Sequence, residues 1–409
     1  MAALRAVLVG GIPLVLGRVF SAVRELWLAH QLGPTDRLTE YVVASTVFLA
    51  LGGLLSGVAS ALMIRDSGRG KHVMPLVLAA STVIIAGFGV FGVLPSTRFE
   101  SGLTVWCLVA MLPFFAAYGV ANGKLIREGK VVVGMVAAGI QPAVALGVMV
   151  LPWTDLTTAA ACGNLAGSIL MTSIVFHSAY RVGPYPSFWI KKTTLMDGLA
   201  IVAVSAANIA SPIIDRFFAA SLGNSGLVLL NLSTIVFAAI TGTLGIALGN
   251  AAVGRSFTSA STVRTREPVI LGVLCSFCVL GMIIPAVSYI NSRTEYAPGS
   301  GESMGLLLAI YSLAIPVALL NQVWIRVWNR KASVRDMLSL AGLLLSINLV
   351  GNFVFVMLFG VLGIAISTVL VQLAQCMYLG SKWHQTGRAA GLVATTVIIG
   401  LVMGRVINA

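Results

Sequence analysis

Charged residues are scarce in this 409-residue chain, where only 10% of all residues carry a formal charge. A soluble globular protein carries about 25% charged residues. Hydrophobic residue types make up 58% of the chain, and its mean hydropathy is +0.98. So few charges cannot solvate the surface of a 42.7 kDa water-soluble fold. The scarcity excludes a soluble enzyme, a disordered chain and a nucleic-acid-binding domain, so no nucleic-acid partner is expected.

Motifs of cofactor-dependent chemistry are also missing. No Gly-rich run ends in the Lys-Ser/Thr pair that cradles ATP phosphates, and the segments between apolar runs are too short for a catalytic domain. The five cysteines lie in apolar segments and indicate no disulfide framework; they are Cys107, Cys162, Cys275, Cys278 and Cys376. We interpret Cys275-x-x-Cys278 as packing, since no further ligands accompany it. The chain is therefore expected to be no enzyme and to hold no cofactor or metal.

Long apolar runs dominate instead. A hydrocarbon core about 30 Å thick needs roughly 20 helical residues to cross it. Thirteen segments meet this description, the last of them short enough to lie partly in the interface: 4–30, 38–64, 73–94, 103–126, 131–153, 156–180, 195–222, 226–253, 269–290, 304–328, 337–359, 361–382 and 389–407. The sequence predicts an all-α integral membrane protein.

The basic residues predict the orientation. With the N-terminus in the cytoplasm, nineteen of the 26 basic residues fall on the cytoplasmic side and only four on the outer side. Cytoplasmic segments of membrane proteins carry such an excess of Lys and Arg. The remaining three, Arg18, Arg24 and Arg216, lie inside predicted spans.

A repeat relates the two halves of the chain. At an offset of 190 residues Glu25 matches Asp215, Ala29 matches Ala219, and Leu32-Gly33 matches Leu222-Gly223. We predict two six-helix lobes, 1–182 and 193–384, joined by an interfacial cytoplasmic linker at 183–192 and followed by an extra helix within 385–409. Six is an even number, so both lobes start on the same side. Such parallel repeats are related by a pseudo-twofold axis along the membrane normal, around a central cavity near the midplane.

Arg18, Arg24 and Glu25 lie within the predicted span 4–30, and Asp215 and Arg216 lie within the predicted span 195–222. An intramembrane charge costs at least about 2.5–3.5 kcal/mol and normally faces a cavity or a partner. The alternatives are a structural ion pair or snorkelling to the interface. Arg18 and Arg24 are six residues apart, which places them about 120° apart around the helix and about 9 Å apart along it. Asp215 and Arg216 are adjacent and do not face each other. A charge pair between lobes, Arg24 with Asp215 or Glu25 with Arg216, is more plausible.

Arginines around a cavity suit an anion, because the planar guanidinium binds phosphate through two parallel hydrogen bonds and keeps its charge. We therefore predict substrate-binding roles for Arg18, Arg24 and Arg216. Most amides inside the spans are expected to bridge helices. Asn208 and Asn231, on the two helices that follow the linker, are additional candidates for substrate contact.

These residues resemble the MurJ/MviN family of lipid II flippases, within the multidrug/oligosaccharidyl-lipid/polysaccharide (MOP) exporter superfamily. The similar motifs run in the family's order; they are Arg18-Val19 with Arg24-Glu25, Asp215-Arg216 with Ala219 and Ser221, Gly245-Ile246 with Ala247-Leu248, and Gly363 with Ala365 and Ser367-Thr368. The resemblance implies outward flipping of an undecaprenyl-diphosphate-linked saccharide by alternating access in the bacterial cytoplasmic (inner) membrane. It also carries the family's acidic residue of the second helix onto Glu40, with Asp36 as the other candidate.

The chain departs from that family at two points. An arginine-rich stretch of the second helix is replaced here by Gly52-Gly53, and the family has fourteen helices where this chain has at most thirteen. Another polyprenyl-linked glycan is therefore left open, as for Wzx-type flippases of exopolysaccharide or O-antigen units. A cation-coupled MATE-like drug exporter is a further alternative, but it needs a carboxylate in the cavity. Expected partners are the lipid-linked saccharide, membrane lipid and either a coupling ion or the membrane potential, with the protein acting as a monomer. Glu25, Glu40 and Asp215 are predicted to form gating charge pairs.

Overall fold

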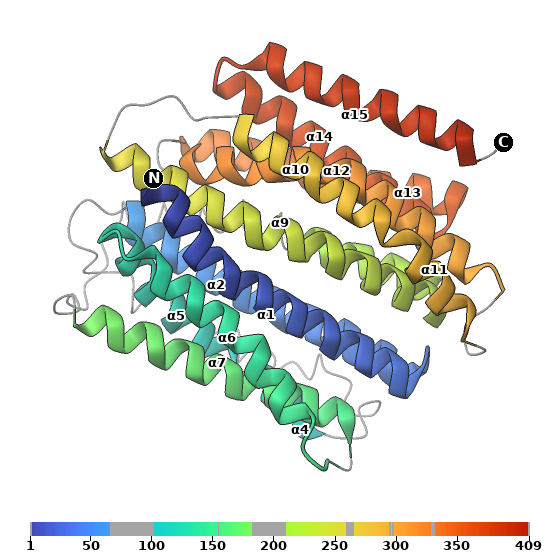
Figure 1. The fold of residues 1–409 in the computed structure, drawn as a ribbon, viewed down its shortest axis with the longest axis horizontal. Helices are drawn as coiled ribbons and strands as arrows, with labels where there is room; N and C mark the ends of the chain where they lie inside the picture. Colours follow the sequence, from blue (N-terminus) through green and yellow to red (C-terminus); the bar gives the residue numbers. More distant parts are fainter. Residues whose placement is uncertain are drawn as a thin grey trace. The chain divides into compact units, whose positions relative to one another are not determined.

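The computed structural model describes residues 2–65, 102–153, 155–181, 210–258, 266–293, 296, 298–328 and 332–407. Every regular element within these ranges is a helix (Figure 1). Nine helical stretches of the same ranges are long and apolar enough to cross a membrane. The described part of the chain is thus all-helical, and its long apolar helices are those of a multi-pass membrane protein. The predicted span 73–94, the predicted linker 183–192 and the predicted span 195–222 up to residue 209 lie outside the described residues.

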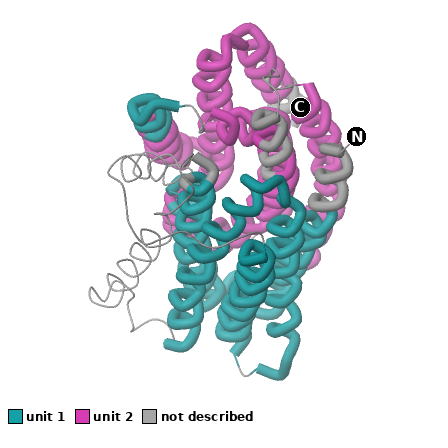
Figure 2. The backbone as a smooth tube through the Cα atoms, turned by 90° about the vertical axis from the view of Figure 1, so that its left-hand side faces the viewer, with its two compact units in different colours: residues 1–213, 329–341 teal, residues 214–328, 342–409 magenta. Residues whose placement is uncertain are grey.

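The chain forms two compact units, distinguished by colour in Figure 2. Unit 1 comprises Met1–Ile213 with Asn329–Ala341, and unit 2 comprises Ile214–Trp328 with Gly342–Ala409. The described helices of unit 1 are α1 (Ala2–Leu32), α2 (Asp36–Arg65), α4 (Gly102–Ala110), α5 (Leu112–Arg127), α6 (Val131–Met149) and α7 (Leu156–Tyr180). Within unit 1, α6 packs against both α1 and α7, and α2 packs against α5.

Unit 2 is built around one buried helix. Residues 210–221 are helical, and unit 2 begins within this helix at Ile214. The helix is followed by α9 (Asn224–Thr258), α10 (Arg266–Gly281), α11 (Ile283–Asn291), α12 (Ser300–Trp328), α13 (Val334–Phe359), α14 (Val361–Lys382) and α15 (Thr386–Ile407). The first turns of α13, up to Ala341, belong to unit 1. Helix α12 packs against α9, α10, α11 and α14. In the most apolar 18-residue segment of α12, 78% of the residues are buried, whereas only 11% are buried in the corresponding segment of Arg266–Asn291. Helix α12 therefore forms the core of unit 2, while α10 and α11 present apolar side chains outward.

Prolines divide two of the predicted spans. The span predicted at 103–126 is interrupted at Met111, two residues before Pro113, and the span predicted at 269–290 is interrupted at Met282, three residues before Pro285. A proline has no N–H for the helical hydrogen bond, and its ring clashes with the carbonyl four residues earlier. Helices α4 and α5 together still form one stretch long enough to cross a membrane, and so do α10 and α11.

Glycines bring α1 and α6 into backbone contact. A Cβ added to Gly139 would lie 2.1 Å from the carbonyl oxygen of Pro13, and one added to Gly17 would lie 2.6 Å from the carbonyl oxygen of Gly139. No side chain fits at either position without moving a helix. Small residues allow membrane helices to approach closely in this way. The contact holds α1, which carries Arg18, Arg24 and Glu25, against α6.

The start of α7 is fixed by a polar cluster around Asp155. The Asp155 carboxylate accepts hydrogen bonds from the backbone N–H groups of Thr157 and Thr158, at 3.1 Å each, and forms an ion pair of 2.9 Å with Arg37. Burial favours the neutral carboxyl group, but the hydrogen bonds from Thr158 and Thr157 and the charge of Arg37 outweigh it and lower the pKa of Asp155 below its usual value. The cluster therefore joins the beginnings of α2 and α7.

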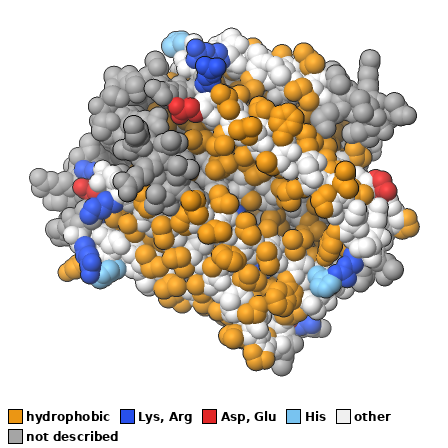
Figure 3. All heavy atoms as spheres, in the orientation of Figure 1, with side chains coloured by type: hydrophobic (Ala, Val, Ile, Leu, Met, Phe, Trp, Pro, Cys, Tyr) orange, Lys and Arg blue, Asp and Glu red, His pale blue; other side chains and the backbone are white. Residues whose placement is uncertain are grey.

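Large hydrophobic side chains cover the surface. Trp106, Phe277, Ile284 and Met357 are each at least 66% exposed. In Figure 3 the described surface is mainly hydrophobic, and charged side chains gather toward its margins. Exposed apolar patches of this extent are unusual in water and normal against lipid.

Candidate functional site

Arg24 lies buried inside unit 1, near the end of α1, where only 4% of the residue is exposed. Its Nη1 donates a hydrogen bond of 2.5 Å to Oδ1 of Asn164 on α7. Its Nη2 donates to Oε1 of Glu25 at 2.6 Å, and this contact is also an ion pair. The Nε atom is buried and has no hydrogen-bond partner among the described residues. Arg24 thus keeps a carboxylate partner but retains one N–H group without an acceptor.

Asn164 connects this arginine to two further helices. Its Nδ2 donates to the hydroxyl of Tyr41 on α2 at 3.4 Å, and its Oδ1 also accepts from Nε2 of Gln141 on α6 at 3.5 Å. Asn164 and Tyr41 are each only 1% exposed. We call Arg24, Glu25, Tyr41, Gln141 and Asn164 the arginine cluster. It joins α1, α2, α6 and α7 through one buried amide.

Asp215 lies at the centre of a second buried cluster, inside unit 2. Its Oδ1 accepts hydrogen bonds from Nδ2 of Asn348 at 3.0 Å and of Asn352 at 2.7 Å. Its Oδ2 accepts from the hydroxyl of Thr368 on α14 at 3.3 Å. Asp215 is 5% exposed and both asparagines are fully buried. We call these four residues the aspartate cluster.

Arg216, the neighbour of Asp215, points to a different helix. Its Nη2 donates a hydrogen bond of 2.9 Å to Oδ1 of Asn231 on α9, and Asn231 is 8% exposed. Arg216 is half-buried. The structure therefore joins two of the predicted site residues, Arg216 and Asn231, within unit 2.

The two clusters are built from corresponding helices of the predicted repeat, but the central charges are opposite in sign. In unit 1 a cation on the first helix contacts an amide on α7, the predicted sixth helix, with a second amide from α6, the predicted fifth. In unit 2 an anion on the 210–221 helix contacts amides on α13 and a hydroxyl on α14, the predicted eleventh and twelfth helices. Unit 1 thus buries a positive charge among amides, and unit 2 buries a negative one.

The other predicted residues lie apart from these clusters. Arg18 is exposed on α1 and has no hydrogen-bond or ion-pair partner among the described residues. Glu40 is half-buried near the start of α2, and no interaction within the described ranges joins it to Arg24 or Glu25. Asn208 lies outside the described residues. That Arg18, Arg24 and Arg216 line one cavity between the lobes, and that charge pairs form across it, stay predictions.

Sequence reasoning assigned no site role to three members of the arginine cluster, namely Tyr41, Gln141 and Asn164. Asn164 stands in an Ala- and Gly-rich helix, and nothing in its neighbourhood marks it out from other amides inside spans. Asn348 and Asn352 carried a usable signal, since residues four apart lie on one face of a helix. The spacing predicts a shared partner for them, and that partner is Asp215.

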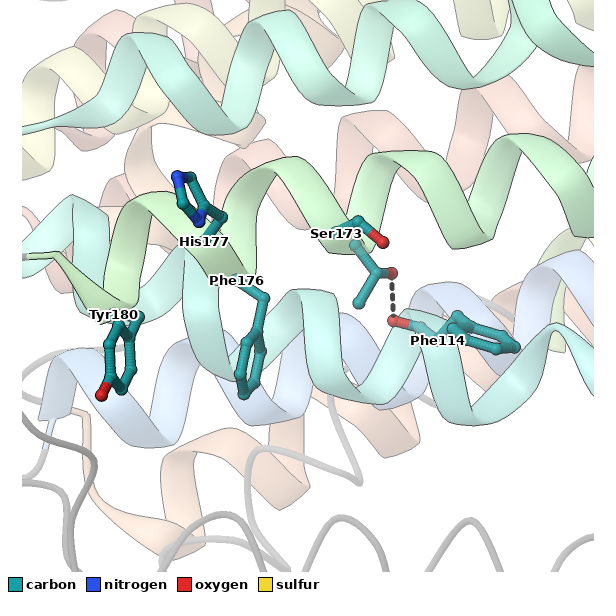
Figure 4. A pocket seen from close by; sticks show the side chains of 6 residues that line it. Phe114, Ser173, Phe176, His177 and Tyr180 are labelled. Atoms are coloured by element: carbon teal, nitrogen blue, oxygen red, sulfur yellow. Dashed lines mark hydrogen bonds between the residues drawn. The ribbon is translucent and has the colours of Figure 1, made fainter.

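A pocket of about 380 Å³ lies elsewhere in unit 1, between α5 and α7 (Figure 4). It is lined mainly by aromatic side chains, namely Phe114, Phe176, His177 and Tyr180, together with Thr172 and Ser173. The Thr172 hydroxyl donates to the Phe114 carbonyl at 2.8 Å and is thereby occupied. The pocket contains none of the predicted site residues.

In the described part of the chain, no group of three His, Cys, Asp or Glu residues is arranged to hold a metal ion. The aspartate cluster holds one carboxylate, which accepts hydrogen bonds from two amides and one hydroxyl.

No protein-family model and no curated protein sequence matches the chain. Solved structures do. A structure of "Lipid II flippase MurJ, inward closed conformation" aligns with a TM-score of 0.68 and 14% identity over 98% of this chain and 93% of that one. An outward-facing multidrug resistance MATE family transporter of the MOP superfamily aligns at 0.67 and 15% identity, over 95% and 96% of the two chains.

A third structure aligns at a TM-score of 0.62 and 14% identity over 95% of this chain and 96% of the other. It is a MOP superfamily transporter from Pyrococcus furiosus, described as having a binding pocket of reverse polarity that suggests a different function. The chain has the fold of the MOP exporter superfamily. At these identities the flippase and the drug exporters are equally similar to it in fold.

Proposed function

We propose that this protein is a flippase, which moves a polyprenyl-diphosphate-linked saccharide from the inner to the outer leaflet by alternating access. The observation that carries the proposal is the buried guanidinium of Arg24, placed in a transporter fold whose other unit carries Arg216. A buried arginine without a function is expensive in a membrane protein. A diphosphate is the group on a membrane lipid that most needs fixed cations.

The physical need is electrostatic. An isolated phosphate charge in a low-dielectric medium has a Born cost of order tens of kcal/mol. Guanidinium groups replace the lost water with fixed positive charge and paired N–H donors. In this account the diphosphate binds to arginines, the saccharide occupies the polar interior, and the polyprenyl tail stays in lipid. The membrane potential, negative inside, favours outward passage of an anion by about 2.3 kcal/mol per charge per 100 mV.

The contacts of Arg24 give the mechanism a specific step. Each of its terminal nitrogens already donates one hydrogen bond, to Asn164 or to Glu25, and only 4% of the residue is exposed. A diphosphate that binds through both terminal nitrogens must therefore compete with Glu25 and Asn164. We expect Glu25 to be the group displaced, because a substrate anion replaces one carboxylate charge by another. The Arg24–Glu25 ion pair then marks the state without substrate.

A MATE-like drug exporter is the second candidate, since a structure of that family aligns about as well. Cation export needs a carboxylate that can face a cationic substrate. In the described residues Glu25 is ion-paired with Arg24, and Asp215 accepts hydrogen bonds from three side chains. Because both carboxylates already have partners, we favour an anionic substrate over a cationic drug.

Two glycines of α2 bear on which glycan is carried. Where the flippase family has arginines in its second helix, this chain has Gly52 and Gly53. A Cβ on Gly52 would lie 2.8 Å from the Phe115 ring, so a long side chain does not fit there, whereas Gly53 faces open space. One cationic group fewer is consistent with a related lipid-linked oligosaccharide in place of lipid II.

Reconstitution tests the proposal. Purified protein in liposomes is given, in separate samples, a fluorescent polyprenyl-diphosphate saccharide, the same saccharide on an uncharged lipid, and a cationic dye. We expect protein-dependent movement, read by a membrane-impermeant quencher, for the diphosphate lipid alone. Transport of the dye with no movement of the diphosphate lipid would replace the flippase by the drug exporter.

A further inference from the structure

Two cysteines from different helices of unit 1 lie side by side. The Sγ atoms of Cys107 on α4 and Cys162 on α7 are 3.1 Å apart, although the residues are 55 positions apart in the sequence. Both are free thiols in this structure. Cys107 is 6% exposed and Cys162 is partly exposed. Neither belongs to the arginine or the aspartate cluster.

The contact between these helices is held in register by polar bonds one turn away. The hydroxyls of Thr104 and Thr158 are 2.8 Å apart, and they precede the two cysteines by three and four residues. Thr158 in turn donates to Asp155, which caps α7. Helices α4 and α7 lie next to each other over this stretch (Figure 1). The sulfurs are therefore placed together by the fold and not by a chance rotamer.

We propose that Cys107 and Cys162 form a redox-active dithiol, whose disulfide links α4 to α7 within unit 1. The inference is independent of the proposed function. The predicted orientation places the starts of α4 and α7 at the outer surface of the cell membrane, where proteins meet an oxidising environment. Cys162, the more exposed thiol, is the one that an oxidant meets first.

The oxidant is a disulfide compound, and the reaction is two thiol–disulfide exchanges. The thiolate of Cys162 attacks one sulfur of the reagent, forming a mixed disulfide and releasing the first thiol of the reagent. The thiolate of Cys107 then attacks Sγ of Cys162, forming the Cys107–Cys162 disulfide and releasing the second thiol. The two cysteine protons end on the released thiols, the protein loses two electrons and the reagent gains them.

The test uses the full chain with Cys275, Cys278 and Cys376 replaced by Ser, so that only the pair is left. The reduced protein, in liposomes, receives one equivalent of 2,2′-dipyridyl disulfide, a small apolar reagent that releases a coloured thione. We expect two thiones per reagent and a protein lighter by two hydrogens with no adduct. Peptide mapping should find the 102–127 and 156–181 segments linked.

The matched control moves one thiol to the other face of α4, by combining Cys107→Ser with Val109→Cys. Residues two apart point about 200° apart around a helix, so this thiol cannot reach Cys162. It should release at most one thione per reagent and keep the adduct. If the unaltered pair also keeps the adduct, or does not react, or links only between two protein molecules, the proposal is wrong.

Discussion

Replacement of Asn164 by Ala tests whether the arginine cluster is assembled around one amide. The change removes an Oδ1 that accepts 2.5 Å and 3.5 Å bonds from Arg24 and Gln141, and an Nδ2 that donates to Tyr41 at 3.4 Å. The two longer bonds are weak on geometry. The bond from Arg24 is charge-assisted, and it dominates the expected effect.

A hydrogen bond to a charged group contributes about 1.5–3 kcal/mol, and a buried donor left without an acceptor costs about 1–3 kcal/mol. Arg24 already has one buried N–H group without a partner, so a second one is not easily absorbed. We therefore expect Asn164→Ala to lower the stability of unit 1 by about 2–3 kcal/mol. The ion pair with Glu25 should survive, because it does not involve Asn164.

The assay is the thermal midpoint of the purified protein in one detergent, with Ser168→Ala as the matched control. Ser168 is equally buried, lies one turn further along α7, and donates only to the backbone carbonyl of Asn164. That variant should change stability by less than about 1 kcal/mol. Equal shifts for the two variants would refute the reasoning, since they would mean that the Asn164 side chain contributes nothing through Arg24.

Three further outcomes are expected from the contacts described. Gly139→Ala should lower the thermal midpoint, at a cost of about 1–3 kcal/mol, because its Cβ meets backbone; Gly147→Ala, with no atom within 4 Å, should be nearly neutral. The pKa of Asp155 is lower in the folded protein than in the unfolded chain, where it is about 3.9. Its contribution to the free energy of unfolding should therefore be complete above about pH 3.9 and be lost as the pH falls through the folded pKa. Asp155→Asn should remove this acid-dependent part of the melting profile. Asp215→Leu should destabilise unit 2 more than Asp215→Asn, by about 2 kcal/mol, because Leu leaves two buried amides without an acceptor whereas Asn keeps one oxygen; equal melting of the two variants would contradict this.

Much of the helical organisation follows from hydropathy and capping. The predicted limits 156–180 and 361–382 coincide with α7 and α14, because Asp155 caps the first and Gly360, with a positive φ of 56°, precedes the second. The interruptions before Pro113 and Pro285 were not predicted. A hydropathy window averages over a single proline, so it detects the span and misses the break.

The site was predictable in its charges and not in its partners. Arg24 and Asp215 stand out because a charge inside an apolar run is rare, and such rarity is visible in sequence. Asn164 becomes a partner of Arg24 only through the register of α7 against α1, which depends on packing between residues 140 positions apart. The proximity of Cys107 and Cys162 has the same origin, so their positions in the chain do not predict it.

The central claim is that the diphosphate binds Arg24 and Arg216, and flipping by arginine variants tests it most directly. The assay compares wild type, Arg24→Ala, Arg24→Lys and Arg216→Ala in liposomes with the fluorescent polyprenyl-diphosphate saccharide, at equal amounts of correctly inserted protein. The account predicts that Arg24→Ala abolishes flipping and that Arg24→Lys restores only part of it, because lysine keeps the charge but loses the paired N–H donors. Flipping by both alanine variants at the wild-type rate would contradict the account.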